Sequence, residues 1–358
     1  MEDLIKGLTI TKTQTPKEKP DPATLGFGEV FTDHMFILDY DEGPGWHDPR
    51  IVPYGPLTLD PAASVFHYAQ EMFEGMKTYR AENGELNLFR PDMNAKRTNT
   101  TNERICLPRI DEKLFVDAVK ALVDVDREWA PDYPGTSLYV RPFVIATEPF
   151  LGVRPAKQYC FMIILSPVGP YYKGGLKPTR IYVEDKYVRS ADGMTGSAKI
   201  GGNYALSLKS QVEAQAKGFA QVLWLDSHER RYVEEIGTSN AFFVINGEVY
   251  TAPLSGTILP GVTRDSVIRI LKDRGVTVRE ERYTIDGIYE AAERGELDEA
   301  FASGTAAVIS PVGELLWKDR SILINNGEIG PLSQSLYDTI TGIQSGALPD
   351  PYGWVVKL

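Results

Sequence analysis

The sequence predicts an α/β protein with two domains. The chain has 358 residues, and a single hydrophobic core stops growing at roughly 250–300 residues. Short strands alternate with helices in the first half, whereas strands predominate in the second. Between them, residues 170–178 are rich in Gly, Pro and Tyr, which is typical of an interdomain loop. The predicted parts are therefore an N-terminal arm (1–25), a small α/β domain (26–169), this loop and a larger domain (179–358).

In the first half, apolar runs bounded by turn residues predict the strands. These are residues 34–40, 76–80, 86–90, 137–147 and 158–168. Asp60-Pro61, an acidic N-cap followed by proline at the first helical position, predicts a helix that continues to about Met72. Asn83-Gly84 predicts a type I′ hairpin turn. Further helices are predicted from Pro91 and, on the helical spacing of apolar residues, over 114–129.

The second half is predicted to contain more strands than helices. The predicted strands are residues 180–184, 220–225, 241–245, 249–252, 276–280 and 306–309. The predicted helices are residues 205–217, 264–274, 285–294 and 332–343.

Composition excludes several function classes. A net charge of −11 and a pI of about 5.0 argue against a partner such as nucleic acid or an anionic membrane. Cys106 and Cys160 cannot form a disulfide framework, and the four scattered His residues form no metal-binding pair. The N-terminus resembles neither a secretory nor a mitochondrial signal, and the longest apolar run, 161–165, cannot cross a bilayer. We therefore expect a cytoplasmic protein without a metal.

Residues 196–204, Gly-Ser-Ala-Lys-Ile-Gly-Gly-Asn-Tyr, contain the first candidate for chemistry. Small residues allow the backbone to hold Lys199 closely, and a lysine amine with a lowered pKa is the group that forms Schiff bases. A surface lysine in a Gly-rich turn is the alternative, and for a single motif of this kind it is the more common one.

An acidic pair, Glu234-Glu235, precedes a Gly-Thr turn and an apolar strand. A carboxylate at such a strand could pair with the pyridinium nitrogen of pyridoxal phosphate and so support its action as an electron sink. The alternative is a solvated acidic turn.

Three further features could bind an anion. Residues 259–264, Leu-Pro-Gly-Val-Thr-Arg, lead into a predicted helix whose first amides are unpaired. Residues 302–306 form a small-residue turn with two hydroxyl groups, and Arg97 could grip a phosphate through two hydrogen bonds. The alternatives are a helix cap, an ordinary turn and a surface arginine.

The predicted strand 137–147 places Tyr139 and Arg141 on one face by alternation. An arginine inside an otherwise apolar strand is costly unless it meets a carboxylate, which a substrate or an exposed acidic partner could supply. By contrast, residues 68–77, which include Phe73, are by themselves explained by core packing.

Taken together and in order, these motifs resemble the class IV family of pyridoxal-phosphate aminotransferases. N-terminal segments narrow the resemblance to branched-chain amino-acid aminotransferases. They are Phe27-Gly28, residues 31–35, Phe-Glu-Gly-Met-Lys at 73–77, Leu-Phe-Arg-Pro at 88–91, Ser-Leu-Tyr-Val-Arg-Pro at 137–142, and Glu148-Pro149 through Leu151-Gly152-Val153. The resemblance runs from about Phe27 to the C-terminus.

The resemblance implies a fold type IV enzyme, a homodimer whose larger C-terminal domain is built on a strand pseudo-barrel and binds the cofactor, pyridoxal 5′-phosphate. It implies ping-pong transfer of amino groups between leucine, isoleucine or valine and 2-oxoglutarate. Lys199 would be the Schiff-base lysine. The cofactor-binding positions would be Arg97, Lys199, Tyr204, Glu235, Thr238, Val262, Thr263 and Thr305. The substrate-binding positions would be Phe27, Tyr68, Phe73, Tyr139, Arg141, Leu151, Val153, Thr238, Thr305 and Ala306.

The sequence departs from some animal members of this family at one motif. Ala307 and Ser310 stand where those members carry a Cys-x-x-Cys pair, so a thiol switch there is not expected. The nearest rivals on the same fold are a D-amino-acid aminotransferase and an aminodeoxychorismate lyase. A non-catalytic module that binds an anion at residues 259–264 is a further alternative.

Overall fold

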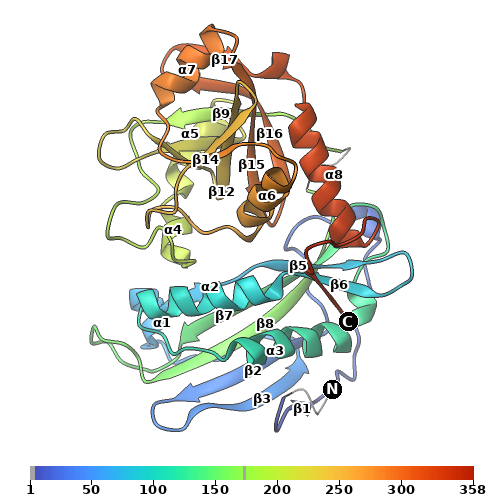
Figure 1. Cartoon of the computed structure of the whole chain (residues 1–358). Coiled ribbons are helices and arrows are strands. Elements are labelled where there is room, and N and C mark those ends of the chain that lie inside the picture. The colour runs from blue at the N-terminus through green and yellow to red at the C-terminus, as the bar shows by residue number, and fades with distance from the viewer. Residues whose placement is uncertain (1–4, 172–174) are drawn as a thin grey trace. The chain divides into compact units, whose positions relative to one another are not determined.

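The computed structural model describes residues 5–171 and 175–358. Residues 1–4 of the predicted arm and residues 172–174 of the predicted interdomain loop lie outside the described residues. The chain divides into two compact units (Figure 1). The first unit comprises the chain up to Tyr171 together with Lys199–Gly201 and Gly342–Leu358, and the second comprises the remainder. The predicted domain boundaries remain predictions.

The first unit is built on a nine-stranded sheet in the order β1-β3-β2-β8-β7-β5-β6-β18, with β4 paired to β7. Its strands are β1 (Thr9–Ile10), β2 (His34–Asp41), β3 (Gly45–Pro53), β4 (Glu71–Phe73), β5 (Met76–Arg80), β6 (Leu86–Phe89), β7 (Ser137–Ala146), β8 (Gln158–Val168) and β18 (Val355–Lys357). All pairs are antiparallel except β1–β3. Burial alternates along β7, so one face of this strand packs in the core while the other carries Tyr139 and Arg141.

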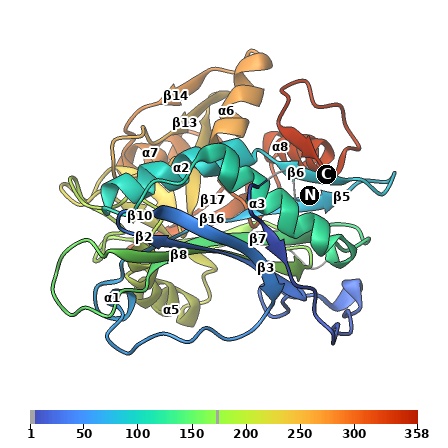
Figure 2. The same ribbon diagram turned by 90° about the horizontal axis from the view of Figure 1, so that it is seen from below.

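The helices of the first unit are α1 (Ser64–Tyr68), α2 (Pro91–Arg104) and α3 (Glu112–Val125), with 3-10 turns η1 (Pro22–Thr24) and η2 (Arg127–Trp129). Figure 2 shows α2 and α3 side by side over the sheet. Asp111 caps α3 by accepting a hydrogen bond from the Leu114 amide at 2.8 Å. The apolar side of α3 packs on the sheet, where Phe115 stacks on Phe161 with ring centroids 5.6 Å apart. This packing fixes the sheet beneath α2, the helix that carries Arg97.

The second unit contains a closed six-stranded barrel. Its strands run in the order β11-β10-β9-β16-β15-β12, and pairing of β11 with β12 closes the ring. They are β9 (Thr179–Glu184), β10 (Gln221–Leu225), β11 (Val233–Ile236), β12 (Ser239–Ile245), β15 (Leu297–Gly304) and β16 (Val308–Trp317), while β13 (Glu248–Thr251), β14 (Val278–Glu280) and β17 (Arg320–Leu323) extend the sheet. The predicted fold type, with its strand pseudo-barrel, is confirmed.

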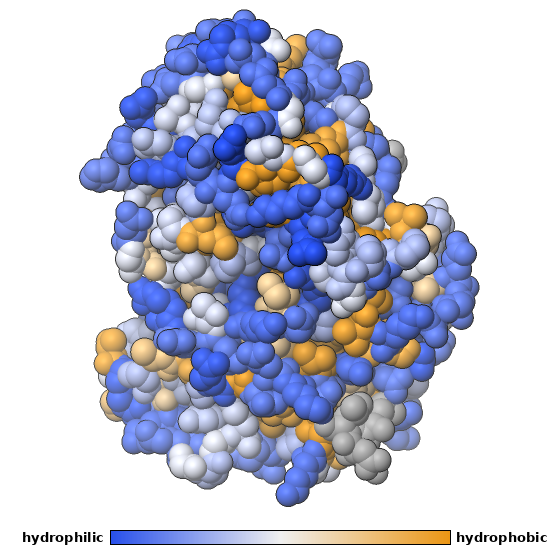
Figure 3. All heavy atoms as spheres, viewed as in Figure 1, coloured by the Kyte–Doolittle hydropathy of each residue, from blue (hydrophilic) through white to orange (hydrophobic). Residues whose placement is uncertain are grey.

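The remaining helices are α4 (Gly201–Ala205), α5 (Leu208–Ala216), α6 (Val262–Asp273), α7 (Ile285–Glu293) and α8 (Pro331–Ser345), with the 3-10 turn η3 (Asn325–Gly327). Ile285, Ile288 and Tyr289 of α7 are fully buried in the apolar cluster that the barrel strands line. On the face shown in Figure 3, hydrophilic side chains surround small apolar groups. Within the described ranges, no helix combines the length and the apolar character needed to cross a membrane.

The predicted helix from Asp60 to about Met72 is wrong at both ends. The segment before α1 is held by residues far along the chain, because the Ser64 amide donates to the Glu148 carbonyl at 3.1 Å. Ala69 then adopts a left-handed conformation (φ 48°) that ends the helix, and Met72 lies in β4, paired with β7. Tertiary pairing therefore overrides the local helix-start signal.

The predicted type I′ turn at Asn83-Gly84 is also wrong. Arg80 pairs with Leu86, and the Ala81 amide donates to the Glu85 carbonyl at 2.9 Å, which leaves a three-residue loop. Gly84 has a positive φ (81°) whereas Asn83 does not, and a type I′ turn requires it at both positions. The glycine instead closes a three-residue hairpin.

Other predicted elements also differ in extent. The helix predicted over 205–217 is divided into α4 and α5, and that over 114–129 ends at Val125 before η2. The turn predicted at 302–306 and the strand predicted at 306–309 are both shifted. Residues 302–304 belong to β15, residues 305–307 form the turn, and β16 begins at Val308.

Candidate active site

Lys199 is fixed through its backbone in the first unit. Its amide donates to the Thr101 hydroxyl on α2 at 3.0 Å, and its carbonyl accepts from the Phe73 amide at the end of β4 at 3.1 Å. The Lys199 ammonium lies 4.6 Å from the centre of the Phe73 ring. Two residues on, the Gly201 amide donates to the Glu71 carboxylate. These contacts hold the lysine between strand and helix, and a mobile surface turn would lack them.

Arg97 projects from α2 onto a buried carboxylate, Glu74. Nε of Arg97 donates to Oε1 at 2.8 Å and Nη2 donates to Oε2 at 2.9 Å, which is a bidentate ion pair. The side chains of both residues are almost completely buried. Arg97 is therefore not the surface arginine of the alternative interpretation.

Tyr139 and Arg141 share one face of β7 and contact each other. Nη2 of Arg141 donates to the Tyr139 hydroxyl at 2.9 Å, and its guanidinium lies 4.8 Å from the Phe73 ring centre. Phe27 meets the Tyr139 ring edge-on, with centroids 5.0 Å apart. Gly75 lies so close that a Cβ there would overlap the Tyr139 hydroxyl. The result is an aromatic surface with one guanidinium on it.

Two more ionisable groups lie on this strand region. Lys77 pairs with Tyr139 across the β5–β7 ladder, and burial lowers the pKa of its amine from 10.5 to about 8. Burial raises the pKa of Glu71, and the hydrogen bond from Gly201 and the positive charge of Arg141 oppose the rise. The described residues thus place two cationic groups and one carboxyl group beside the aromatic surface.

The loop after β7 carries two exposed aliphatic side chains. Val153 is 83% exposed and Leu151 is also exposed. The Tyr68 hydroxyl donates to the Leu151 carbonyl, and Arg154 forms a bidentate pair with Glu148 at 2.7 and 3.1 Å. The loop is thus held in shape while its apolar tip faces outward.

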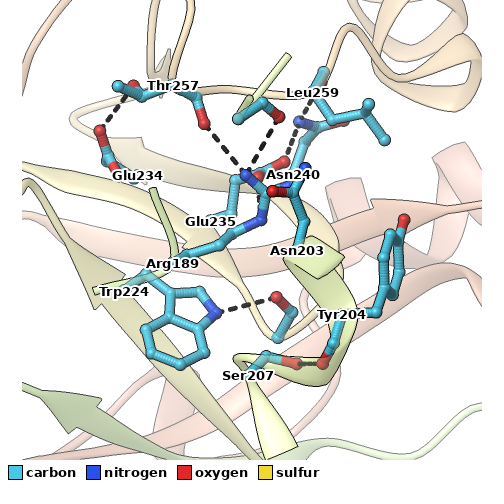
Figure 4. Close-up of polar contacts among 12 residues, drawn as sticks. Arg189, Asn203, Tyr204, Ser207, Trp224, Glu234, Glu235, Asn240, Thr257 and Leu259 are labelled. Carbon is cyan, nitrogen blue, oxygen red and sulfur yellow. Dashed lines mark hydrogen bonds and ion pairs between the residues drawn. The ribbon is translucent and has the colours of Figure 1, made fainter. Parts of the chain in front are cut away.

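In the second unit, Glu235 is a buried carboxylate with fixed partners (Figure 4). Nε of Arg189 lies 2.7 Å from Oε2, and Nδ2 of Asn240 donates to Oε1 at 2.8 Å. Arg189 is itself held by the carbonyls of Gly196 and Thr257, at 3.3 and 3.0 Å. The Arg189 guanidinium at this distance offsets part of the cost of burying the Glu235 carboxylate.

The neighbouring acid, Glu234, has different surroundings. Its Oε1 accepts a hydrogen bond from the Thr257 hydroxyl at 2.7 Å, and burial raises the pKa of its carboxyl group. Both acids are buried, so the solvated acidic turn of the alternative interpretation does not occur.

The anion-binding candidates of the second unit lie beside Glu235. Asn240 also donates to the Leu259 carbonyl at 2.9 Å and pairs with Ser303 across β12–β15. The acid, the start of α6 and the turn after β15 are therefore neighbours. Gly261 is the N-cap of α6, and no described side chain caps this helix, whose first residues are Val262 and Thr263. The amides of the first turn of a helix are groups that can bind an anion.

Three predicted positions form the rim of this region. Thr238 is exposed in the turn between β11 and β12, while Thr305 and Ala306 are half-buried in the turn between β15 and β16. Tyr204 lies on α4 beside Asn203, whose Nδ2 donates to the carbonyls of Thr195 and Ala198 at 2.7 and 2.9 Å (Figure 4). The Asn203 side-chain amide thus holds together the loop of small residues that contains the lysine motif.

Comparison with known proteins decides the family. The family model described as Amino-transferase class IV matches residues 71–315. Branched-chain-amino-acid aminotransferase 2 of Bacillus subtilis is 55% identical over 351 residues, covering 98% of this chain and 97% of that protein. The chain belongs to the branched-chain-amino-acid aminotransferases of class IV. It is a transaminase, and the family predicted from its motifs is confirmed.

Solved branched-chain aminotransferases share the fold. The Escherichia coli enzyme is similar with a TM-score of 0.75 and 25% identity, covering 89% of this chain and 98% of that one. The enzyme of the archaeon Thermoproteus uzoniensis, solved with norvaline, is similar with a TM-score of 0.73 and 26% identity, covering 90% of this chain and 99% of that one. The groups of each unit fit parts of pyridoxal phosphate. In the first unit, an amine and a guanidinium match its aldehyde and its phosphate. In the second, a buried carboxylate and a helix N-terminus without a side-chain cap match its pyridine nitrogen and its phosphate.

Sequence reasoning missed several supporting residues of this aminotransferase. Glu74, Arg189 and Asn240 hold Arg97 and Glu235 in place, yet none was a candidate. For Glu74 a signal existed, because an acid inside the apolar Phe-Glu-Gly-Met segment needs a partner when buried. Arg189 offered no such signal in the sequence, because its partner, Glu235, is 46 positions away. Among the described residues, no group of three or more His, Cys, Asp and Glu side chains could hold a metal.

Proposed function

We propose that this chain transfers amino groups between leucine, isoleucine or valine and 2-oxoglutarate, with pyridoxal 5′-phosphate as its cofactor. The observation that carries the proposal is the 55% identity to a branched-chain-amino-acid aminotransferase over nearly the full length of both chains. The described contacts of the predicted site residues support it. Pyridoxal phosphate, when bound, is an electron sink that stabilises negative charge at the substrate Cα.

Lys199 is the residue that holds the cofactor covalently and moves the proton. Its backbone is fixed to Thr101 and Phe73, so the freedom of the Nζ atom is limited to its own side chain. With the cofactor bound, the Lys199 Nζ would take the proton from the substrate Cα and deliver it to the cofactor rather than back to Cα. The cycle is ping-pong because the amino group remains on the enzyme between the two substrates.

Other side chains bind and orient the cofactor. Glu235 would present its carboxylate to the pyridine nitrogen and keep that nitrogen protonated, and the Tyr204 hydroxyl would bind the ring hydroxyl. Arg97 binds the phosphate. The further phosphate and cofactor positions are the amides of Val262 and Thr263 and the hydroxyl groups of Thr238 and Thr305.

The substrate positions must accept both an apolar branched side chain and the carboxylate of glutamate. Phe27 and Phe73 provide an apolar wall, and Arg141, held by Tyr139, provides a cation for the distal carboxylate. The remaining substrate positions are Tyr68, Leu151, Val153, Thr238, Thr305 and Ala306.

We also propose that the enzyme is a cytoplasmic homodimer. The exposed aliphatic residues Leu151 and Val153, on a loop shaped by the Glu148–Arg154 pair, support a second copy covering this loop.

A spectrum and a panel of amino donors test the function. Purified protein with pyridoxal phosphate should have a visible absorption band that borohydride removes, and it should use leucine, isoleucine and valine with 2-oxoglutarate. Lys199→Ala should lose both the band and turnover, whereas Lys209→Ala, at an exposed lysine paired with Glu213, should keep them. A colourless protein would indicate the anion-binding module, and turnover of D-amino acids alone would indicate the D-amino-acid rival.

A further inference from the structure

Glu74 is a fully buried carboxylate with four hydrogen-bond donors. Two come from Arg97, at 2.8 and 2.9 Å. The Asn94 amide donates to Oε2 at 2.7 Å, and the Gly75 backbone amide donates to the same oxygen at 3.1 Å. Asn94 and Arg97 are one turn apart on α2, so a single carboxylate fixes one face of this helix.

The Glu74 carboxylate is held in its charged form. Burial alone would raise its pKa, but the Arg97 guanidinium, with help from the Lys199 ammonium and the Asn94 amide, keeps the pKa below its ordinary value. A buried ion pair is by itself weak evidence for stability, because desolvation offsets most of the attraction. Control over the direction of the Arg97 side chain is a better account of what this pair does.

The pair orients the guanidinium in one direction. Glu74 accepts hydrogen bonds from both Nε and Nη2, so the carboxylate fixes the plane and the direction of the Arg97 guanidinium. An arginine side chain that is already immobilised loses less conformational freedom when it binds an anion.

We propose that Glu74 is a positioning residue that holds Arg97 in the orientation needed to bind the cofactor phosphate. The proposal rests on the proposed function, in which Arg97 binds that phosphate. Two effects oppose each other. Removing the negative charge of Glu74 leaves Arg97 more attractive to an anion, whereas removing its hydrogen bonds releases the guanidinium. Both oxygens of Glu74 accept hydrogen bonds from Arg97, and one of them also accepts from Asn94. We therefore expect the loss of a fixed orientation to weaken phosphate binding more than the removal of the negative charge strengthens it.

The test compares two ligands that differ only in the phosphate. The full-length chain is stripped of cofactor and titrated with pyridoxal phosphate and with pyridoxal. Glu74→Gln should weaken the affinity for pyridoxal phosphate by about 10- to 100-fold, the loss expected for a charge-assisted contact. It should change the affinity for pyridoxal by less than about twofold. Arg97→Ala should show the same selectivity, and adding Glu74→Gln to it should cause no further loss.

A matched control is Glu248→Gln, which breaks another bidentate Arg–Glu pair, that with Arg279, and should change neither affinity. Equal losses for both ligands, or an unchanged or tighter affinity for pyridoxal phosphate in Glu74→Gln, would overturn the positioning role. If Arg97→Ala retains full affinity for pyridoxal phosphate, the phosphate role of Arg97 fails and this inference with it. Should Glu74→Gln not fold, as judged by circular dichroism, Glu74→Asp replaces it and should lose affinity for pyridoxal phosphate alone.

Discussion

Replacing Arg189 with methionine should destabilise the protein through Glu235. In the native chain, Arg189 and Glu235 lie 2.7 Å apart, with side chains only 6% and 2% exposed. Methionine fills much of the same volume but carries no charge. The substitution therefore leaves the buried carboxylate without this cation, although the Asn240 amide still donates to it. It also leaves the carbonyls of Gly196 and Thr257 without the guanidinium donor.

The expected cost follows from the burial of this pair. Removing one partner of a buried ion pair costs about 3–5 kcal/mol. For a folding unit of 150–250 residues, each kcal/mol lowers the melting temperature by about 2–4 °C. Arg189→Met should thus lower the melting temperature by about 6–20 °C. Because the cost arises from a buried carboxylate that has lost this cation, also replacing Glu235 with Gln should recover about 0.5–3 kcal/mol relative to the sum of the two single changes.

Thermal unfolding followed by circular dichroism, without added cofactor, measures these effects. Arg180→Met is the control, since Arg180 forms a comparable pair with Glu314 but is half exposed, and its melting temperature should change little. Additive effects of the Arg189 and Glu235 substitutions, or a fall no larger than that of the control, would refute the reasoning.

Four further predictions concern single side chains. Glu235→Gln should retain cofactor but slow proton removal from the substrate strongly, while Glu234→Gln should be tolerated because its amide oxygen can still accept from the Thr257 hydroxyl; steady-state rates showing the opposite pattern would mean that the wrong acid was chosen. Arg141→Ala should reduce kcat/KM with glutamate at least about tenfold more than with leucine, and equal losses would contradict its role. Val153→Asp should weaken both the dimer and branched-chain turnover, which a fully active monomer in the ultracentrifuge would disprove. Lys77 binds its proton more tightly in the unfolded chain than when it is buried. As pH rises from about 8 to 10.5, the free energy of unfolding of the wild type should therefore rise by up to about 3 kcal/mol relative to that of Lys77→Met. Parallel pH profiles of urea unfolding for the two proteins would exclude this.

Local sequence patterns predicted the elements whose periodicity survives in the fold. β7 and β8 and helices α3, α6 and α7 were predicted close to their observed positions, because alternation or helical spacing in each reflects one buried face. Pairing between distant segments was not visible. β18 was not predicted, since its three residues become a strand only by pairing with β6, more than 260 positions earlier.

The site was predictable to the extent that its residues form ordered motifs. Lys199, Glu235 and residues 259–264 became candidates because each stands in a short run with an unusual composition, and their roles remain predictions. Their supports were not found, because the fold alone determines which buried charges meet. Glu74 meets Arg97, and Arg189 meets Glu235, across turns of the chain that no local spacing encodes.

The first unit is assembled from three separate stretches of the chain, which limits how the gene can be divided into fragments. The backbone passes from one unit to the other near residues 171, 199, 201 and 342. A fragment that ends at the predicted interdomain loop would lack the lysine segment and also β18, so the β6 edge would be left unpaired and prone to aggregation. The complementary fragment would carry that lysine away from Thr101 and Phe73. Domain exchange between relatives that keeps the contacts of the first unit within one parent must therefore transfer its three separate stretches together.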